Sequence, residues 1–371
     1  MAETESWPEG IFSARMIEAL AAAGSIAADR PLDADQVQPA SLDLRLGAVA
    51  YRVRASFLPG PDATVADRIA ALKLHEIDLA AGAVLERGCV YIVPLVERLA
   101  LPATVRAASN PKSSTGRLDI FTRLIVDRVM RFDTVPAGYA GPLYLEISPR
   151  TFPVLVRTGS RLGQMRFLTG DPWLTPEEHR SLHARARLVD RDQEVGQGVA
   201  LSIDLMGEAR GGLVGFRSRR HTAVVDVDKR AALDVLDFWD PLYARGRGEL
   251  ILDPDEFYIL VSRESVVVPP DHAAEMVPFD PLVGEFRVHY AGFFDPGFGH
   301  SAAGGSGSRA VLEVRSHEVP FLLGHGQTIG RLIYGRMAEV PQRLYGAALG
   351  SNYQAQSLKL SKHFRPFPAQ V

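Results

Sequence analysis

The sequence predicts a mainly β protein built from two tandem domains, with only a few short helices. The chain has 371 residues, more than the roughly 250–300 residues at which a single hydrophobic core stops growing. Short runs rich in Val, Leu, Ile and Phe are bounded by Gly, Pro, Asp or Ser, as at 89–94, 143–147, 258–262 and 310–314. The 25 prolines and 33 glycines separate such runs at a spacing typical of barrels and sandwiches.

An internal repeat is the main indication of two domains. Tyr91-Ile92-Val93, Glu97 and Pro102 recur as Tyr258-Ile259-Leu260, Glu264 and Pro269, an offset of 258 − 91 = 167. Leu145-Glu146-Ile147, Pro153 and Gly159 recur as Leu312-Glu313-Val314, Pro320 and Gly326 at the same offset. A third echo, 41–44 against 202–205, has an offset of 161. Short apolar strands resemble one another, but matched Glu and Pro residues are not required by strand periodicity. We therefore expect a duplicated β domain.

One helix and one linker are predicted from local patterns. Residues 12–23 carry apolar side chains at helical spacing, with Ser13 placed to cap the helix and Gly24 to end it. The segment 179–197 is dense in Arg, Asp, Glu and Gln, which indicates a linker with helical stretches inside it. We expect one domain over residues 1–185 and a second over 195–371.

Composition excludes several classes of protein. No apolar run approaches the ~18 residues that cross a bilayer, and the N-terminus lacks a basic segment followed by an apolar one. The net charge of −3 is spread over interspersed acids and bases, unlike the basic surface of a nucleic-acid-binding protein. The single cysteine, Cys89, excludes an internal disulfide and a C-x-x-C zinc site. We expect a soluble, cytoplasmic protein that binds neither membranes nor nucleic acid.

The segment Asn110-Pro111-Lys112-Ser113-Ser114-Thr115-Gly116-Arg117 is the first candidate for chemistry. It combines two cations, hydroxyls and a small turn residue, groups that can hold a polyphosphate through backbone N–H groups and a bidentate guanidinium. It is not a P-loop, because the Lys precedes the Gly. A surface turn that caps the next element is the alternative interpretation.

Two carboxylates within apolar strands are the second candidate. Glu146 and its repeat partner Glu313 lie in Leu-Glu-Ile and Leu-Glu-Val. An unpaired carboxylate costs several kcal/mol to bury, so each is exposed, ion-paired or retained for chemistry. The functional interpretation is a general base whose pKa an apolar cleft raises.

The third candidate is the Gly-rich hairpin 291–299, which has Asp295 at its turn. Asp-Pro-Gly is a turn signal by itself, and its functional version is a tight loop that admits a flat base or a sugar. The zinc deaminase signature, H-x-E with a following P-C-x-x-C, does not occur among these 371 residues. Deamination by this chain would therefore need no zinc.

Together these motifs resemble the dCTP deaminase branch of the dUTPase superfamily. Residues 39–47 (Pro-Ala-Ser-Leu-Asp-Leu-Arg-Leu-Gly) are similar to the family's opening strand, and 112–117 are similar to its R-S-S-x-x-R segment. Glu146 lies where the family has its catalytic glutamate, and Gly159 with Gln164 matches a G-x-x-x-x-Q strand. Residues 353–356 and 360–362 resemble the C-terminal segment that closes over the triphosphate. The resemblance implies two tandem dUTPase-like domains, barrel-like or jelly-roll-like.

The two copies differ in which motifs they keep. The second copy has residues 280–285 where Ser-Ser-x-Gly-Arg would fall, yet its hairpin with Asp295 resembles the family's nucleoside hairpin better than residues 131–133 do. In the family the sites lie at subunit interfaces of a trimer. Two arrangements are therefore open: Ser113 and Arg117 meet Glu146 of another chain, or they meet Glu313 and the C-terminal tail. We favour Glu313 and keep Glu146 as the alternative.

The resemblance also implies roles for single residues. Glu313 or Glu146 would activate water, while Ser113 and Arg117 would orient the base. The remaining substrate-binding candidates are Lys112, Ser114, Gln164, Tyr353 and Gln356, with Asp295 and Asp133 for the deoxyribose. Mg²⁺ would be bound through the triphosphate, with no metal site on the protein itself, and the chain would form a homo-oligomer. The alternatives are a dUTP diphosphatase, a bifunctional enzyme, and a non-catalytic nucleotide-binding regulatory module.

Overall fold

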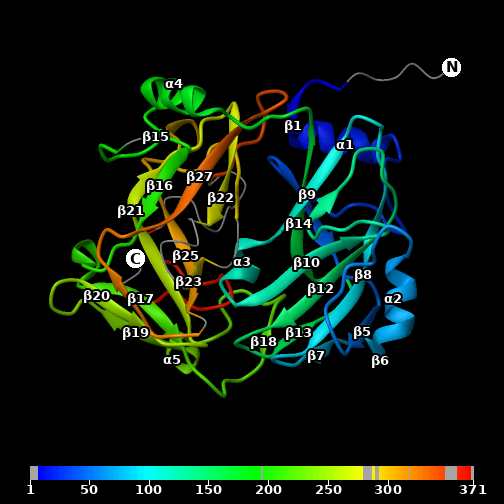
Figure 1. Cartoon of the computed structure of the whole chain (residues 1–371), viewed down its shortest axis with the longest axis horizontal. Coiled ribbons are helices and arrows are strands. Elements are labelled where there is room, and N and C mark those ends of the chain that lie inside the picture. The colour runs from blue at the N-terminus through cyan, green and yellow to red at the C-terminus, as the bar shows by residue number, and fades with distance from the viewer. Residues whose placement is uncertain are drawn as a thin grey trace.

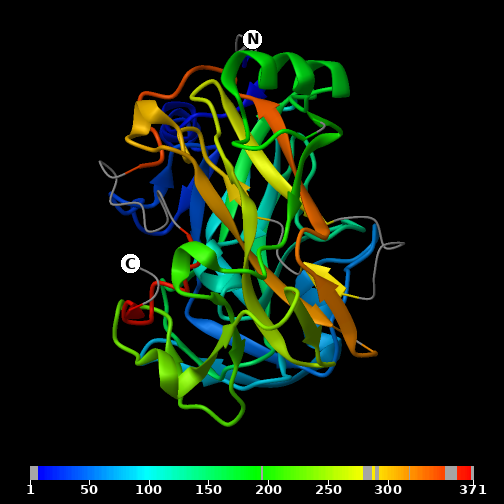
Figure 2. The ribbon, with the colours of Figure 1, turned by 90° about the vertical axis from the view of Figure 1, so that its left-hand side faces the viewer.

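In a computed structural model, the chain folds into two β units that lie side by side (Figure 1). The structure describes residues 7–193, 195–278, 286–288, 292–316, 318–346 and 357–368. After a turn of 90°, the C-terminal half lies in front of the N-terminal half (Figure 2). Among the described residues, no helix is long and apolar enough to cross a membrane. The predicted mainly β class is confirmed.

The N-terminal half is built on two large sheets. Its elements are β1 (Gly10–Ile11), α1 (Ala14–Ala22), β2 (Ile26–Ala28), β3 (Val37–Gln38), β4 (Ser41–Arg45), β5 (Val49–Val53), α2 (Val65–Leu72), β6 (Lys73–Asp78), β7 (Ala83–Leu85), β8 (Val90–Ala100), β9 (Arg106–Pro111), α3 (Ser113–Gly116), β10 (Ile120–Val126), β11 (Thr134–Val135), β12 (Ala140–Pro149), β13 (Val154–Val156) and β14 (Arg161–Thr169). One sheet has the order β11-β9-β14-β4-β3, with β1 on β14, and the other β10-β12-β8-β5-β6, with β2 on β8.

The C-terminal half repeats this plan. Its elements are α4 (Pro176–Ala186), β15 (Val195–Gly196), β16 (Gly198–Ser202), η1 (Glu208–Arg210), β17 (Leu213–Ser218), β18 (Val225–Asp226), α5 (Val235–Phe238), β19 (Trp239–Tyr243), β20 (Glu249–Leu252), β21 (Phe257–Val266), β22 (His272–Pro278), β23 (Phe286–Val288), β24 (Phe293–Phe294), η3 (Ser301–Ala303), β25 (Ser308–Ser316), β26 (Phe321–Gly324) and β27 (Thr328–Arg336). The sheet orders are β24-β22-β27-β16-β15 and β23-β25-β21-β17-β19, the same as in the first half.

Matching hydrogen bonds confirm the duplication. The hydroxyl of Tyr91 accepts from the backbone N–H of Glu86 at 3.0 Å, and that of Tyr258 accepts from Asp253 at 2.9 Å. Both pairs are related by 167 positions, since 258 − 91 and 253 − 86 both equal 167. The offset predicted from sequence therefore relates equivalent positions of β8 and β21.

The third predicted echo is wrong in register. Glu97 accepts from the backbone N–H of Arg45 at 2.9 Å, and its repeat partner Glu264 accepts from Ser202 at 2.8 Å. Arg45 therefore corresponds to Ser202, an offset of 202 − 45 = 157 rather than 161. The Ser-x-Asp-Leu letters at 202–205 begin at the last residue of β16, four positions beyond the residues that match 41–44 of β4.

Local capping explains the helices at the start of each half. Ser13 caps α1 by accepting from the N–H of Met16, as predicted. Thr175 and Glu178 form a capping box at the start of α4. Helix α4 occupies part of the polar segment predicted as the linker, so a helix stands at the start of the second half.

Apolar contacts and one shared sheet join the halves. Strand β18 of the second half pairs in parallel with β13 of the first, with Val225 opposite Val154. The ring of Phe152 packs edge-on against Trp239, with ring centroids 5.4 Å apart. Both aromatic residues are fully buried in a core cluster that spans the two halves. This burial fixes one half relative to the other and so positions any site between them.

Candidate functional site

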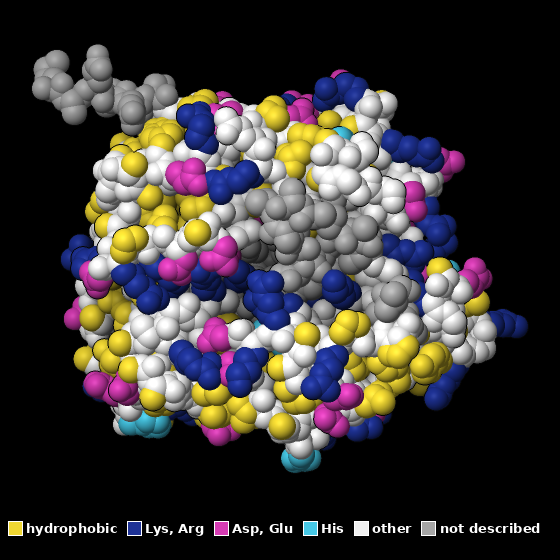
Figure 3. All heavy atoms as spheres, turned by 180° about the vertical axis from the view of Figure 1, so that it is seen from behind, with side chains coloured by type: hydrophobic (Ala, Val, Ile, Leu, Met, Phe, Trp, Pro, Cys, Tyr) yellow, Lys and Arg dark blue, Asp and Glu magenta, His cyan; other side chains and the backbone are white. Residues whose placement is uncertain are grey.

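A cavity of about 430 Å³ lies between the two halves. Lining residues include Lys112, Ser113 and Arg117 of the N-terminal half. Asp295 and Glu313 line the cavity from the C-terminal half. Viewed from behind the molecule, Lys and Arg side chains gather about a hollow near the middle of the face (Figure 3). A single chain thus brings together the hydroxyl-and-guanidinium segment and a strand carboxylate.

The one-turn helix α3 presents the predicted phosphate and base segment. It begins directly after the end of β9, and the C-terminal tail (357–368) packs against it (Figure 1). The Nη1 of Arg117 donates to the carbonyl of Lys359 at 2.9 Å. The hydroxyl of Ser361 donates to the carbonyl of Ser114 at 2.7 Å. The tail therefore holds both α3 and the residue that follows it.

Glu313 is the carboxylate of this cavity. It lies on β25 opposite Ile259, with only 5% of its surface exposed. Burial raises the pKa of Glu313 to about 7, although the nearby Arg117 guanidinium acts to lower it. The Nε of Arg117 is 3.9 Å from the Oε1 of Glu313. A carboxyl group that titrates near neutrality beside a fixed cation is suited to general base catalysis.

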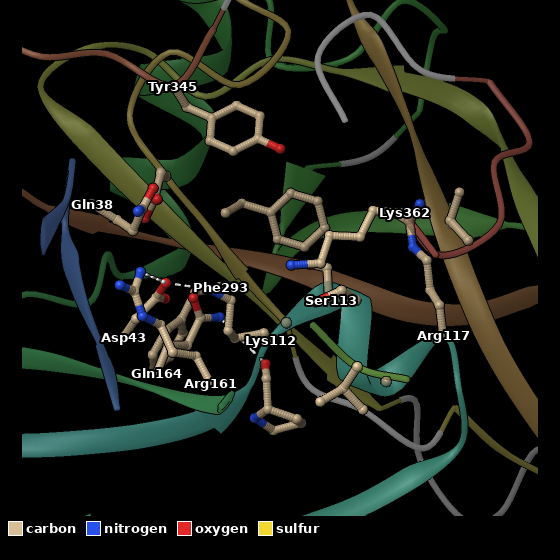
Figure 4. Close-up of a pocket in the computed structure, with 18 of the residues that line it drawn as sticks. Gln38, Asp43, Lys112, Ser113, Arg117, Arg161, Gln164, Phe293, Tyr345 and Lys362 are labelled. Carbon is tan, nitrogen blue, oxygen red and sulfur yellow. Dashed lines mark hydrogen bonds and ion pairs between the residues drawn. The ribbon is translucent and has the colours of Figure 1, made fainter. Parts of the chain in front are cut away.

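Several cations line the cavity. Asp43, Arg161 and Gln164 lie on one side of the view in Figure 4, and Arg117 and Lys362 on the other. Arg161 is ion-paired to Asp35 in the loop before β3, and Lys112 is ion-paired to Asp43.

Lys362 adds a titratable cation to this lining. Burial, together with repulsion from Lys112 and Arg230, lowers its pKa to about 8. Cations held close together in a partly enclosed site favour a polyanionic ligand.

The Gly-rich hairpin of the second half forms another wall. Phe293, Phe294 and Asp295 line the cavity, and the ring of Phe294 packs edge-on against Phe298, with centroids 5.0 Å apart. Gln164 of β14 lines the cavity as well, and its amide donates to the carbonyl of Pro111 at 3.3 Å. Flat apolar rings beside a carboxylate suit a sugar or a base.

The structure places Glu146 and Asp133 away from the described lining of this cavity. On β12, Glu146 points to the same side as Tyr144, which belongs to a small apolar cluster beneath α2. Burial raises its pKa, and the side chain of Ser56 hydrogen-bonds to it. Asp133 accepts from the N–H of Leu124 at 2.8 Å, and burial raises its pKa to about 7. Of the two alternative bases, only Glu313 lies beside Arg117.

Several predicted elements lie outside the described residues. Tyr353 and Gln356 belong to this group, as does the segment 280–285 of the second copy. Sequence reasoning missed Arg161, Arg230 and Tyr345, which line the cavity, and assigned no role to Lys362. Lys362 carried a signal, since it ends the tail motif 360–362. The other three had none, because single Arg and Tyr residues are common on surfaces.

Two family models match consecutive parts of the chain. The model of the 2′-deoxycytidine 5′-triphosphate deaminase N-terminal domain matches residues 8–171, and that of the C-terminal domain matches residues 175–364.

Solved and curated proteins agree with this match. The chain is 66% identical to a crystal structure of 2′-deoxycytidine 5′-triphosphate deaminase from Agrobacterium tumefaciens, with a TM-score of 0.86 over 89% of this chain and 99% of that one. A "dCTP deaminase, dUMP-forming" of Beutenbergia cavernae is 30% identical over 182 residues, 46% of this chain and 90% of the relative. A dCTP deaminase of Halorubrum lacusprofundi is 32% identical over 142 residues, 37% of this chain and 66% of the relative.

Proposed function

The chain belongs to the 2′-deoxycytidine 5′-triphosphate deaminase family and deaminates dCTP to dUTP, and we propose that it does so in the cavity between its halves with Glu313 as the base. The observation that supports this assignment is the position of Glu313, buried and 3.9 Å from Arg117. The cavity also combines cations for a triphosphate with aromatic rings for a nucleoside.

The reaction follows from this arrangement. Ionised Glu313 takes a proton from water, and the resulting hydroxide adds to C4 of cytosine. Glu313 then passes that proton toward the 4-amino group, the C4–N bond breaks, and ammonia leaves; the proton of the added hydroxyl ends on N3 as the C4 carbonyl of uracil forms. Ser113 and Arg117 orient the base and stabilise the charge that develops on it, because both are fixed before the substrate arrives. Water and dCTP thus give dUTP and ammonia.

The rest of the nucleotide would follow the cavity wall. Asp295 accepts a hydrogen bond from the deoxyribose, and Phe293 and Phe294 pack against the sugar. Lys112, Ser114, Gln164 and Lys362 hold the phosphates, with Tyr353 and Gln356 of the tail as further candidates. The closely spaced cations Lys112, Arg230 and Lys362 of the cavity wall support this placement of the triphosphate.

The residues of the cavity also suit a Mg²⁺ ion carried by the triphosphate. Within the described part of the chain, no group of three or more His, Cys, Asp or Glu side chains is placed to hold a metal ion. Asp43 lines the cavity but is ion-paired to Lys112. Mg²⁺ prefers phosphate oxygens and water to an all-protein cage, so the ion would neutralise phosphate charge.

Substitution of the two glutamates tests the assignment of the base. We expect Glu313→Gln to lower kcat for ammonia release from dCTP by about 10²–10⁴-fold, the usual contribution of a general base. Glu146→Gln is the matched control, since it changes the equivalent strand position of the other half. Arg117→Ala should also abolish ammonia release from a folded protein. Full activity in Glu313→Gln, or loss confined to Glu146→Gln, would assign the base to the first half.

A bifunctional enzyme is the second candidate, because several relatives are named dUMP-forming dCTP deaminases. Such an enzyme would also hydrolyse the triphosphate and release dUMP with diphosphate. The test measures ammonia, dUTP, dUMP and diphosphate from one dCTP reaction. Equal ammonia and dUTP without dUMP indicates a deaminase alone, and a folded protein that binds dCTP without any product indicates a regulatory module.

We also propose that the enzyme is a homo-oligomer. The family resemblance supports this, although one chain already supplies both faces of the cavity. Analytical ultracentrifugation of the purified protein, with and without dCTP, tests it. A single species of one chain mass at micromolar concentration would contradict it.

A further inference from the structure

Arg166 is a buried cation that the reaction scheme does not use. It lies on β14 of the N-terminal half, two residues after Gln164, and only 1% of its surface is exposed. Neighbouring positions in the strand, Met165 and Phe167, belong to the apolar core. An arginine is almost never fully buried unless it has partners, so its contacts indicate what it does.

The contacts of Arg166 cross to the other half of the chain. Its Nη1 donates to the carbonyl of Ala274 at 3.2 Å, and its Nη2 donates to the carbonyl of Phe294 at 3.4 Å. Ala274 and Phe294 are partners in the pairing of β22 with β24. The guanidinium therefore bridges β22 and the strand β24, which carries the Gly-rich hairpin. A further bond, from its Nε to Ala40 at 3.4 Å, ties it to its own half.

Arg166 also holds the functional side chains of the hairpin. Its Nη2 is 3.2 Å from the Oδ1 of Asp295, and the centre of its guanidinium is 4.1 Å from the centroid of the Phe293 ring. A guanidinium over an aromatic face is an attractive contact, strongest where water is excluded. Phe293 and Asp295 line the cavity, whereas Arg166 lies behind them.

We propose that Arg166 is a positioning residue for sugar recognition. From the first half, it fixes the position of the hairpin of the second half and of Asp295 on that hairpin. This inference rests on the proposed function of the cavity. Arg166 makes no contact with substrate in this scheme and acts through Asp295. Both halves then contribute to the part of the cavity wall that would contact the sugar. The proposed catalytic pair likewise takes Arg117 from one half and Glu313 from the other.

The charge balance around Asp295 gives Arg166 a second effect. Burial and Asp43 raise the pKa of Asp295, and Arg166 opposes them. Glu275 of β22 also faces Arg166. Burial raises the pKa of Glu275, and the charge of Arg166 opposes this rise. Without the guanidinium the pKa of Asp295 rises, so at neutral pH the side chain tends to the neutral acid and accepts the sugar hydroxyl less well.

A comparison of two nucleotides tests the proposal. We measure kcat/KM for dCTP and for 2′,3′-dideoxycytidine triphosphate, which lacks the 3′-hydroxyl that Asp295 would accept. The wild type should prefer dCTP by about tenfold or more, since removing one partner of a buried polar group leaves the other unsatisfied. In Arg166→Met we expect this preference to fall to within about twofold, because Asp295 is no longer held. Arg166→Lys, which keeps the charge but not the fork, should fall between them.

Two controls separate positioning from general damage. Arg45→Met removes another fully buried arginine, bonded to Glu97 at 2.7 Å within the first half, and should lower Tm while keeping the wild-type preference. Raising the pH should partly restore dCTP turnover in Arg166→Met, because it ionises Asp295. If Arg166→Met does not fold, the preference of Arg166→Lys decides.

The outcomes distinguish this inference from the function on which it rests. An unchanged preference in folded Arg166→Met or Arg166→Lys would overturn the role of Arg166 alone, as would a wild type that does not discriminate. A wild type that releases no ammonia from dCTP would overturn the proposed function. Calorimetric binding of the same two nucleotides still tests the role of Arg166 in that case.

Discussion

Asp119 of the N-terminal half forms a buried ion pair with Arg315 of the C-terminal half, and each lies two residues along the chain from a member of the Arg117 and Glu313 pair. The hydroxyl of Thr151 joins the pair, donating to Asp119 at 2.6 Å and accepting from Arg315 at 3.0 Å. Asp119 and Arg315 are 1% and 4% exposed. A second charged contact between the halves therefore stands next to the Arg117–Glu313 contact.

Breaking this ion pair should loosen the interface between the halves. We expect Asp119→Ala to lower the free energy of unfolding by about 3–5 kcal/mol, because it leaves the buried Arg315 without its carboxylate. It should also lower kcat, since Glu313 and Arg117 depend on the same alignment. Urea unfolding and the rate of ammonia release measure the two effects.

A less buried ion pair provides the control. Arg220 and Glu256 are paired within the C-terminal half, with 59% of the Arg220 side chain and 15% of the Glu256 side chain exposed. Surface pairs contribute about 0–1 kcal/mol, so Glu256→Ala should have little effect. Equal stability of Asp119→Ala and Glu256→Ala would show that the Asp119 pair does not hold the halves together.

The pH dependence of kcat/KM should report the titration of Glu313. Its pKa is raised to about 7, and the base must be ionised to take a proton from water. Activity should therefore rise as pH increases through about 7, until the loss of the Lys362 proton above about pH 8 weakens dCTP binding and lowers kcat/KM again. Arg117 lowers this pKa, so the residual activity of Arg117→Gln should need a higher pH. A pH–rate profile of both proteins checks the prediction, which an acid limb near pH 4.5 in the wild type would contradict.

Much of the fold could be predicted because it depends on local patterns. Apolar runs between turn residues marked β8, β12, β21 and β25, and Ser13 marked the start of α1. The repeat offset of 167 was correct because Glu and Pro positions carry information that apolar alternation lacks. The offset of 161 was wrong, because a four-letter match does not define where a strand ends.

The site could be predicted only in part, because it is made by contacts between distant segments. Sequence indicated the residue types of 112–117 and both glutamates, but not which glutamate meets Arg117. That choice depends on how the halves pack. Arg166 was missed because an arginine within an apolar strand has the same local appearance as an outward-facing one. Only the hairpin of the other half shows why it is buried.

Lys362 should couple nucleotide binding to proton uptake. Its pKa is lowered to about 8 by burial and by nearby cations, and the negative charge of a bound triphosphate would raise it. Binding should therefore take up protons above about pH 8, and affinity for dCTP should fall as pH rises from 7 to 9. Calorimetry in two buffers of different ionisation enthalpy measures the uptake.

Two variants check that Lys362 is the group responsible. Lys362→Met should bind dCTP more weakly, with little proton uptake. Lys362→Arg should keep most of the affinity without the uptake, because a guanidinium stays charged throughout this range. Wild-type proton uptake in Lys362→Met would assign the effect to another group.

Asp133 provides a test that separates stability from sugar recognition. Its pKa is raised to about 7 in the folded protein, above the usual 3.8, so the folded state binds the proton more tightly and stability falls as pH rises between these values. The slope cannot exceed about 1.4 kcal/mol for each pH unit. Asp133→Asn stays neutral and can still accept from the N–H of Leu124. We expect it to raise Tm at pH 8 but not at pH 4, with dCTP turnover retained. A folded Asp133→Asn that no longer releases ammonia would instead place Asp133, rather than Asp295, at the substrate.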